Sequence, residues 1–96
     1  STASLMATYY EILNTSSNWL SQKGINKKLA NTYVAELFLA LSQDALNKSS
    51  RGFKKLVADS QTPKGLNMQV LNELKKGKFF TNFIKALDNV NKRVSK

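Results

Sequence analysis

Apolar residues recur at a helical spacing from the first residues of the chain onward. In residues 1–24 the positions on one stripe are Leu5, Tyr9, Ile12, Leu13, Ser16, Trp19 and Leu20. This spacing is typical of an amphipathic helix. Lys23 and Gly24 end the segment in the order expected for a positively charged last turn followed by a left-handed cap. The pattern therefore predicts a first helix that stops at Gly24.

A second helix is predicted over residues 27–48, where Asn26 is placed to cap the N-terminus. Its middle, Leu-Phe-Leu-Ala-Leu at 37–41, is apolar on every side rather than along one stripe. Such a helix is normally buried all round. One way for a domain of this size to cover it is to pack it against a second protomer, so the pattern suggests a dimer.

Three shorter helices are predicted in the second half of the chain. Ser49 and Ser50 are placed to cap a helix over residues 51–60, which Gly52 would weaken by up to about 1 kcal/mol relative to alanine. The apolar positions of the last two helices are Leu66, Val70, Leu71 and Leu74 before Gly77, then Phe80, Phe83, Ile84, Leu87 and Val94 within 78–94. No segment alternates as a β-strand does. The expected fold class is all-α, with five helices in a single domain over residues 1–96.

The composition excludes several kinds of chemistry. The 96 residues include no cysteine and no histidine. The chain therefore has no disulfide and no thiolate nucleophile, and it lacks histidine, the commonest general base. The six acidic residues are scattered without metal-ligand spacing, and no metal site is expected. No segment approaches the roughly 20 apolar residues that a membrane span needs. We therefore expect a cytoplasmic protein that does not act in a membrane.

The formal charge of +9, from fifteen Lys and Arg against six acids, raises nucleic acid or an anionic surface as a partner. The lysines are spread along the chain, and only Arg51 and Arg93 are arginines. Arginine is the residue favoured for reading phosphates and base edges. A lysine-rich solvated surface explains the charge at least as well as nucleic acid does, so a basic nucleic-acid-binding protein is kept as an alternative.

The only proline, Pro63, lies in a turn between the third and fourth predicted helices. Proline biases Thr62 away from helix, and Gly65 has no Cβ, so a ligand or another backbone can approach closely. The fourth helix begins directly after, and its free N–H groups and positive dipole end face this turn. The turn is either a sharp connector or a site for a small anion such as a carboxylate.

From this turn outward the chain resembles the C-terminal helical dimerisation domain of pyrroline-5-carboxylate reductase. That family carries a Ser-Pro-Gly-Gly-Thr-Thr turn, then a helix, a glycine and a Phe-rich final helix. Here Thr-Pro-Lys-Gly-Leu-Asn stands at 62–67, followed by VLNELKKGKFFTNFIKAL at 70–87. Lys-Gly-Ile-Asn at 23–26 stands where the family has Gly-Leu-Pro, and the family's opening Gly-Ser-Gly-Pro-Ala falls on residues 3–7.

The resemblance implies an intertwined homodimer within an NAD(P)H-dependent oxidoreductase. Such an enzyme reduces a cyclic imine carboxylate to proline in proline biosynthesis, with the cofactor bound mainly by an N-terminal Rossmann domain. This sequence contains no G-x-G-x-x-G motif. We therefore expect the C-terminal part of a longer enzyme, inactive alone, with no catalytic residue of its own and no metal.

The resemblance also assigns substrate binding to the turn and to the opening motif. The residues concerned are Thr62, Pro63, Lys64, Gly65, Leu66, Asn67 and Ser4. Several depart from the family pattern: Lys64 replaces a glycine, Leu66 a threonine or small residue, and Asn67 the last threonine, while Leu5 and Met6 replace Gly-Pro. Lys64 either adds a positive charge for a carboxylate or blocks its close approach. These departures leave open a degenerate reductase relative kept as a structural dimer.

Overall fold

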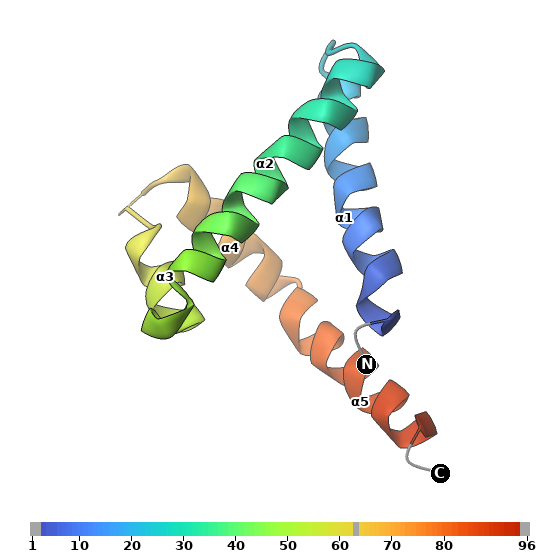
Figure 1. Ribbon diagram of the computed structural model, residues 1–96, viewed down its shortest axis with the longest axis vertical. Coiled ribbons are helices and arrows are strands. Elements are labelled where there is room, and N and C mark those ends of the chain that lie inside the picture. Colours follow the sequence, from blue (N-terminus) through green and yellow to red (C-terminus); the bar gives the residue numbers. More distant parts are fainter. Residues whose placement is uncertain (1–2, 63, 95–96) are drawn as a thin grey trace. The chain divides into compact units, whose positions relative to one another are not determined.

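The computed structural model describes residues 3–62 and 64–94, which form helices and no strand (Figure 1). The α-helices are α1 (Ala3–Gln22), α2 (Lys27–Asn47), α3 (Phe53–Asp59), α4 (Leu66–Lys76) and α5 (Phe79–Val94), with a 3-10 helix at Ser49–Arg51. The predicted all-α class is confirmed. The chain divides into two compact units, Ser1–Ser50 and Arg51–Lys96.

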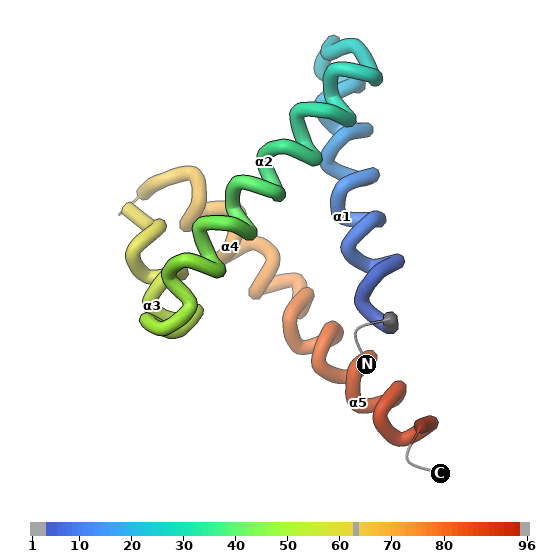
Figure 2. Tube along the Cα trace, in the orientation of Figure 1, coloured from blue at the N-terminus to red at the C-terminus, as the bar shows by residue number. Residues whose placement is uncertain are grey.

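The first unit is a hairpin in which α1 and α2 pack against each other (Figure 2). Its connection begins at Gly24, whose φ of 103° is in the left-handed region. The Gly24 N–H donates to the Ser21 carbonyl at 3.0 Å, and the Ile25 N–H donates to the Leu20 carbonyl at 3.2 Å. These two bonds form a Schellman motif. The helix stop predicted at Gly24 is therefore confirmed.

Asn26 caps the second helix as predicted. Its side-chain oxygen accepts from the N–H groups of Lys28 at 2.9 Å and Leu29 at 3.3 Å. We expect Asn26→Ala to lower the free energy of unfolding by about 1 kcal/mol, because two first-turn donors lose their acceptor. Urea unfolding followed by circular dichroism would measure the change. Asn26→Ser is the control, since serine restores a cap, and equal midpoints for the alanine variant and the unmodified chain would contradict the assignment.

The buried part of the contact between α1 and α2 is built from small apolar and polar side chains, and an edge-to-face ring contact between Tyr9 and Phe38 also joins the two helices. Ala30 and Val34 are the buried apolar residues among those described, and Ser17 is 2% exposed. The Ser17 hydroxyl donates to Asn31 Oδ1, and Lys27 Nζ donates to the Ser17 hydroxyl at 3.2 Å. This polar group links the two helices near the hairpin turn. Small residues let the helices approach closely, so most large apolar side chains remain outside the contact.

The second unit contains α3, the turn, α4 and α5, with α4 packed against α5. The predictions for α4 and α5 are confirmed to within one residue, since α4 ends before Gly77 and α5 begins at Phe79. Lys78 joins them with a φ of 62°, a left-handed value that is uncommon for a residue with a side chain.

The prediction for the third helix is wrong at its start. Ser49 and Ser50 do not cap α3, because they belong to the 3-10 helix. The N-cap of α3 is Gly52, with a φ of 83° and no side-chain hydrogen bond. A left-handed residue interrupts the helical path there, so Gly52 precedes the helix rather than weakening its interior. The helix is correspondingly shorter than the predicted 51–60.

Candidate functional site

The turn predicted to bind substrate connects α3 to α4. The Gly65 N–H donates to the Thr62 carbonyl at 2.8 Å, which closes the turn. Gly65 is then the N-cap of α4, with φ −77° and ψ 162°, and no side chain accepts from the first-turn N–H groups. A Cβ built on Gly65 would overlap the Thr62 hydroxyl oxygen and lie 2.9 Å from the Thr62 carbonyl oxygen. Glycine is therefore required here by space rather than by its φ.

Asn67 ties the start of α4 back to the end of α3. Its side-chain amide Nδ2 donates to the Ser60 carbonyl at 3.1 Å, across seven residues. This bond holds the two ends of the turn together. It leaves the side-chain oxygen Oδ1 of Asn67 as a further polar group at the turn. Sequence reasoning missed Ser60, because a backbone acceptor carries no side-chain signal.

Charge at this turn is positive. Residues 60–72 contain no acid, and Lys64 is their only charged residue. Lys64 is exposed and has a φ of 61°, at the position where the resemblance places a glycine. The N-terminus of the eleven-residue α4 adds the positive end of the helix dipole. The turn can therefore hold a small anion against the backbone N–H groups of Leu66 and Asn67.

The structure places the predicted site residues as follows. Thr62, Lys64, Gly65, Leu66 and Asn67 are brought together in one continuous turn of the second unit. Leu66 is 80% exposed, so its side chain points away from the unit's packed contacts. Pro63 lies outside the described residues. Ser4 belongs to the first unit, where it is half-buried in the first turn of α1.

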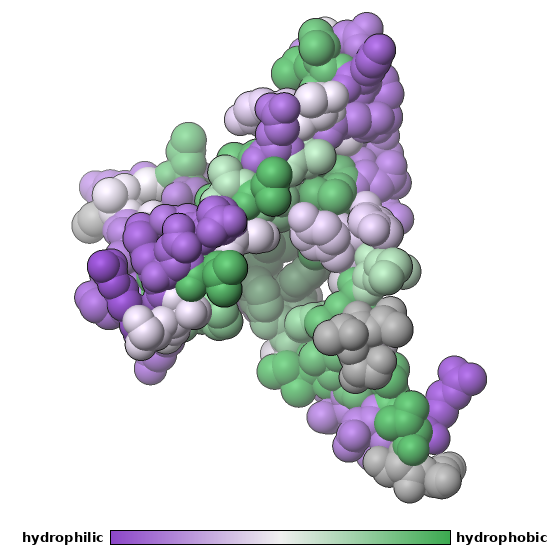
Figure 3. Space-filling view, viewed as in Figure 1, coloured by the Kyte–Doolittle hydropathy of each residue, from purple (hydrophilic) through white to green (hydrophobic). Residues whose placement is uncertain are grey.

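The second feature that bears on function is the set of large apolar side chains that the single chain leaves exposed. None of residues 37–41 is fully buried; Leu39 is 69% and Leu41 is 55% exposed. Figure 3 shows hydrophobic residues reaching the surface among hydrophilic ones. In the second unit Phe53 is 65% and Ile84 is 58% exposed. The all-round burial expected of the Leu-rich segment of α2 is therefore not achieved within one chain.

The total exposed surface of the chain, polar and apolar together, can be compared with that of compact proteins. The chain exposes 8298 Å², whereas two separate compact units of half its mass would together expose about 6600 Å². The excess, about 1700 Å² per chain, is larger than the roughly 800 Å² per partner of a standard protein interface. The chain therefore has surface enough to cover against a second copy.

Neither a metal site nor a membrane-spanning helix is present within residues 3–62 and 64–94. No three His, Cys, Asp or Glu side chains gather there in a way that could hold a metal ion. No helix of the described part is long and apolar enough to cross a membrane.

An all-helical fold with a large outward apolar surface defines a helical dimerisation domain. The sequence model of the family described as pyrroline-5-carboxylate reductase dimerisation matches residues 1–96. The chain therefore belongs to this family, and the resemblance inferred from the sequence is confirmed. A comparison with curated proteins and one with solved structures each gave no match.

Proposed function

We propose that this chain is the homodimerisation and substrate-binding part of an NAD(P)H-dependent reductase that acts on a cyclic imine carboxylate such as pyrroline-5-carboxylate. The observation that carries the dimer is the exposure of the Leu-rich segment of α2, where Leu39 is 69% and Leu41 is 55% exposed. Family membership supports the reductase. Hydride transfer to an imine is chemistry that the cofactor supplies, so the lack of histidine and cysteine is compatible with it.

This chain lacks the usual signature of a dinucleotide site. The sequence contains no G-x-G-x-x-G, and the described residues contain no strand that could precede one. A separate dinucleotide-binding domain would have to hold the cofactor. The part proposed for this chain is to bind the substrate and fix its orientation, and the full enzyme is proposed to act in proline biosynthesis in the cytoplasm.

Within the chain, the turn at 62–67 would grip the substrate carboxylate. The first-turn N–H groups of α4 lack side-chain acceptors and point outward, so they can donate to a carboxylate. Lys64 adds a positive charge beside them. Asn67 fixes the turn through its bond to the Ser60 carbonyl. The position of Ser4 in the opening motif makes it a further candidate for contact with substrate.

Binding of L-proline, the product, tests this assignment without the cofactor. We expect proline to shift the backbone amide resonances of Leu66, Asn67 and Met68 in a saturable way. Prolinamide, which has no carboxylate, is the control and should shift them at least fivefold less at equal concentration. Equal shifts from the two compounds would contradict a carboxylate site. No saturable shift from proline would favour the alternative of a degenerate relative that serves only as a structural dimer.

Lys64→Gly is expected to stabilise the chain and to weaken proline binding. Left-handed backbone costs a residue with a side chain about 1 kcal/mol, and glycine avoids that cost. The same change removes the charge beside the carboxylate, so the dissociation constant for proline should rise about two- to fivefold. Lys78→Gly is the matched control, because Lys78 has a φ of 62° but lies after α4. It should raise stability equally and leave proline binding unchanged. Tighter proline binding by Lys64→Gly would show instead that the lysine blocks the turn.

A further inference from the structure

The positive charge is concentrated in one unit of the chain. Eleven of the fifteen basic residues and three of the six acids lie in Arg51–Lys96, which therefore carries +8 of the total +9. The lysines extend along the chain, as the sequence shows, but most of them belong to the second unit. Among the described residues of this unit, one ion pair forms, between Lys55 and Asp59 at 3.1 Å. Most of the lysines of this unit face solvent without an acidic partner.

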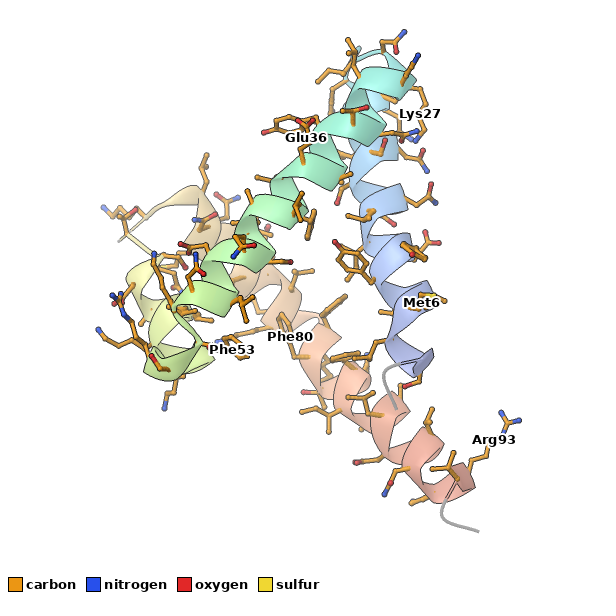
Figure 4. All side chains as sticks on the ribbon, viewed as in Figure 1. Met6, Lys27, Glu36, Phe53, Phe80 and Arg93 are labelled. Atoms are coloured by element: carbon orange, nitrogen blue, oxygen red, sulfur yellow. The ribbon has the colours of Figure 1, made fainter. Side chains whose placement is uncertain are left out.

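Two of these lysines line a hollow of about 290 Å³ formed by α3, α4 and α5. Lys54 comes from α3 and Lys75 from the last turn of α4. The remaining lining is apolar, from Val57, Leu71 and Phe80. Phe80 lies in the first turn of α5 (Figure 4). We call this hollow the Lys54–Lys75 pocket. No acid lines it, and neither lysine takes part in an ion pair among the described residues.

A hollow in the first unit provides a comparison. It has a volume of about 350 Å³ and is lined by Leu20, Ile25, Leu29, Thr32, Tyr33 and Glu36. Both hollows are largely apolar, but the charge on this one is negative, whereas the charge on the Lys54–Lys75 pocket is positive. An anion is therefore repelled by the first and attracted by the second. The sign of charge at the two hollows selects the ligand class.

We propose that the Lys54–Lys75 pocket binds a small amphipathic anion, with an aromatic or other apolar body and a phosphate, sulfonate or carboxylate group. The ammonium groups of Lys54 and Lys75 hold the anionic group through charge-assisted hydrogen bonds. The apolar body lies against Phe80, Val57 and Leu71, where an aromatic ring also gains from ring–ring contact. The site shares no residue with the turn at 62–67 and does not depend on the function proposed for that turn.

Phenyl phosphate is the probe, because it combines a ring with a dianion. We expect saturable binding with a dissociation constant on the order of 1 mM, as suits a ligand of this size. The shifted amide and side-chain resonances should be those of the five lining residues. Inorganic phosphate and phenol each carry half of the recognition, and each should bind at least fivefold more weakly. Shifts that fall instead on residues 64–68 would overturn the assignment by placing the anion at the turn.

A pair of double variants separates this pocket from the general basic surface. Lys54→Gln with Lys75→Gln removes both cations from the pocket. Lys55→Gln with Lys76→Gln removes the same charge from the adjacent positions on the same two helices, which do not line it. The first pair should raise the dissociation constant for phenyl phosphate at least fivefold, and the second less than twofold. Equal effects would overturn the proposal, because the attraction would then be diffuse. Absence of saturable binding to the unmodified chain, as when a second copy covers the pocket, would also overturn it.

Discussion

Leu39→Asp is expected to convert the dimer of this chain into a monomer. Leu39 is 69% exposed in the single chain, so the substitution removes little packing within the hairpin. Burial of a leucine in an interface contributes about 1.5–3 kcal/mol, and a two-fold symmetric dimer loses it twice. Burial of an unpaired carboxylate costs more still. The dimer dissociation constant should therefore rise at least about a hundredfold.

Sedimentation velocity across a range of protein concentrations would measure this effect. Leu39→Met is the control, because methionine keeps an apolar side chain of similar volume and should leave the dimer intact. The measurement is repeated at low and high salt, since an apolar interface should withstand salt. A dimer that survives Leu39→Asp would place the interface elsewhere than on this face of α2, and a chain that is monomeric without substitution would remove the dimer altogether.

The helices of this chain could be predicted from the sequence because their ends carry local signals. Asn26 caps α2, and Gly24 and Gly77 mark where α1 and α4 end. The start of α3 was mispredicted for the opposite reason. Serine is a good cap, and no local pattern shows that Ser49 and Ser50 continue into a 3-10 turn that Gly52 then breaks with a positive φ.

The candidate site was only partly visible in the sequence. The turn at 62–67 could be located because proline and glycine mark it, and the resemblance gave it a role. The bond from Asn67 to the Ser60 carbonyl could not be foreseen, since it joins a side chain to a backbone group seven residues away. The Lys54–Lys75 pocket was also hidden, because its two lysines are 21 positions apart in the sequence and line one hollow only in the folded unit.

The case for a dimer rests on the Leu-rich segment of α2, where the sequence pattern and the burial in the single chain disagree. The sequence pattern at 37–41 requires burial on every side, and the hairpin covers α2 mainly along the stripe that contains Ala30 and Val34. A stable monomer would leave this requirement unmet, at a cost proportional to the exposed apolar area. The mismatch between pattern and burial is therefore evidence for a partner, and family membership indicates a second copy of the chain.

Gly65→Ala is expected to have the largest effect on the turn. The added methyl group would overlap the Thr62 hydroxyl and meet the Thr62 carbonyl oxygen at 2.9 Å. Because that carbonyl accepts the Gly65 N–H, the backbone must move and the closing bond of the turn must lengthen or break. Overpacking of this kind costs about 1–3 kcal/mol. The N–H groups that point out of α4 would move with it, so proline affinity should fall at least tenfold.

Gly77→Ala provides the matched control for this substitution. Gly77 caps the other end of α4 with a φ of −78°, nearly the same as the −77° of Gly65. A Cβ there would meet its nearest backbone atoms at 3.6 and 3.7 Å, which is ordinary contact. Alanine at 77 should therefore raise the free energy of unfolding by about 0.4–1 kcal/mol, since it restricts the unfolded chain. Urea unfolding and proline titration of both variants separate the two effects. If Gly65→Ala matched Gly77→Ala in both measurements, the close approach at Thr62 would affect neither stability nor binding, and the turn would be a connector only.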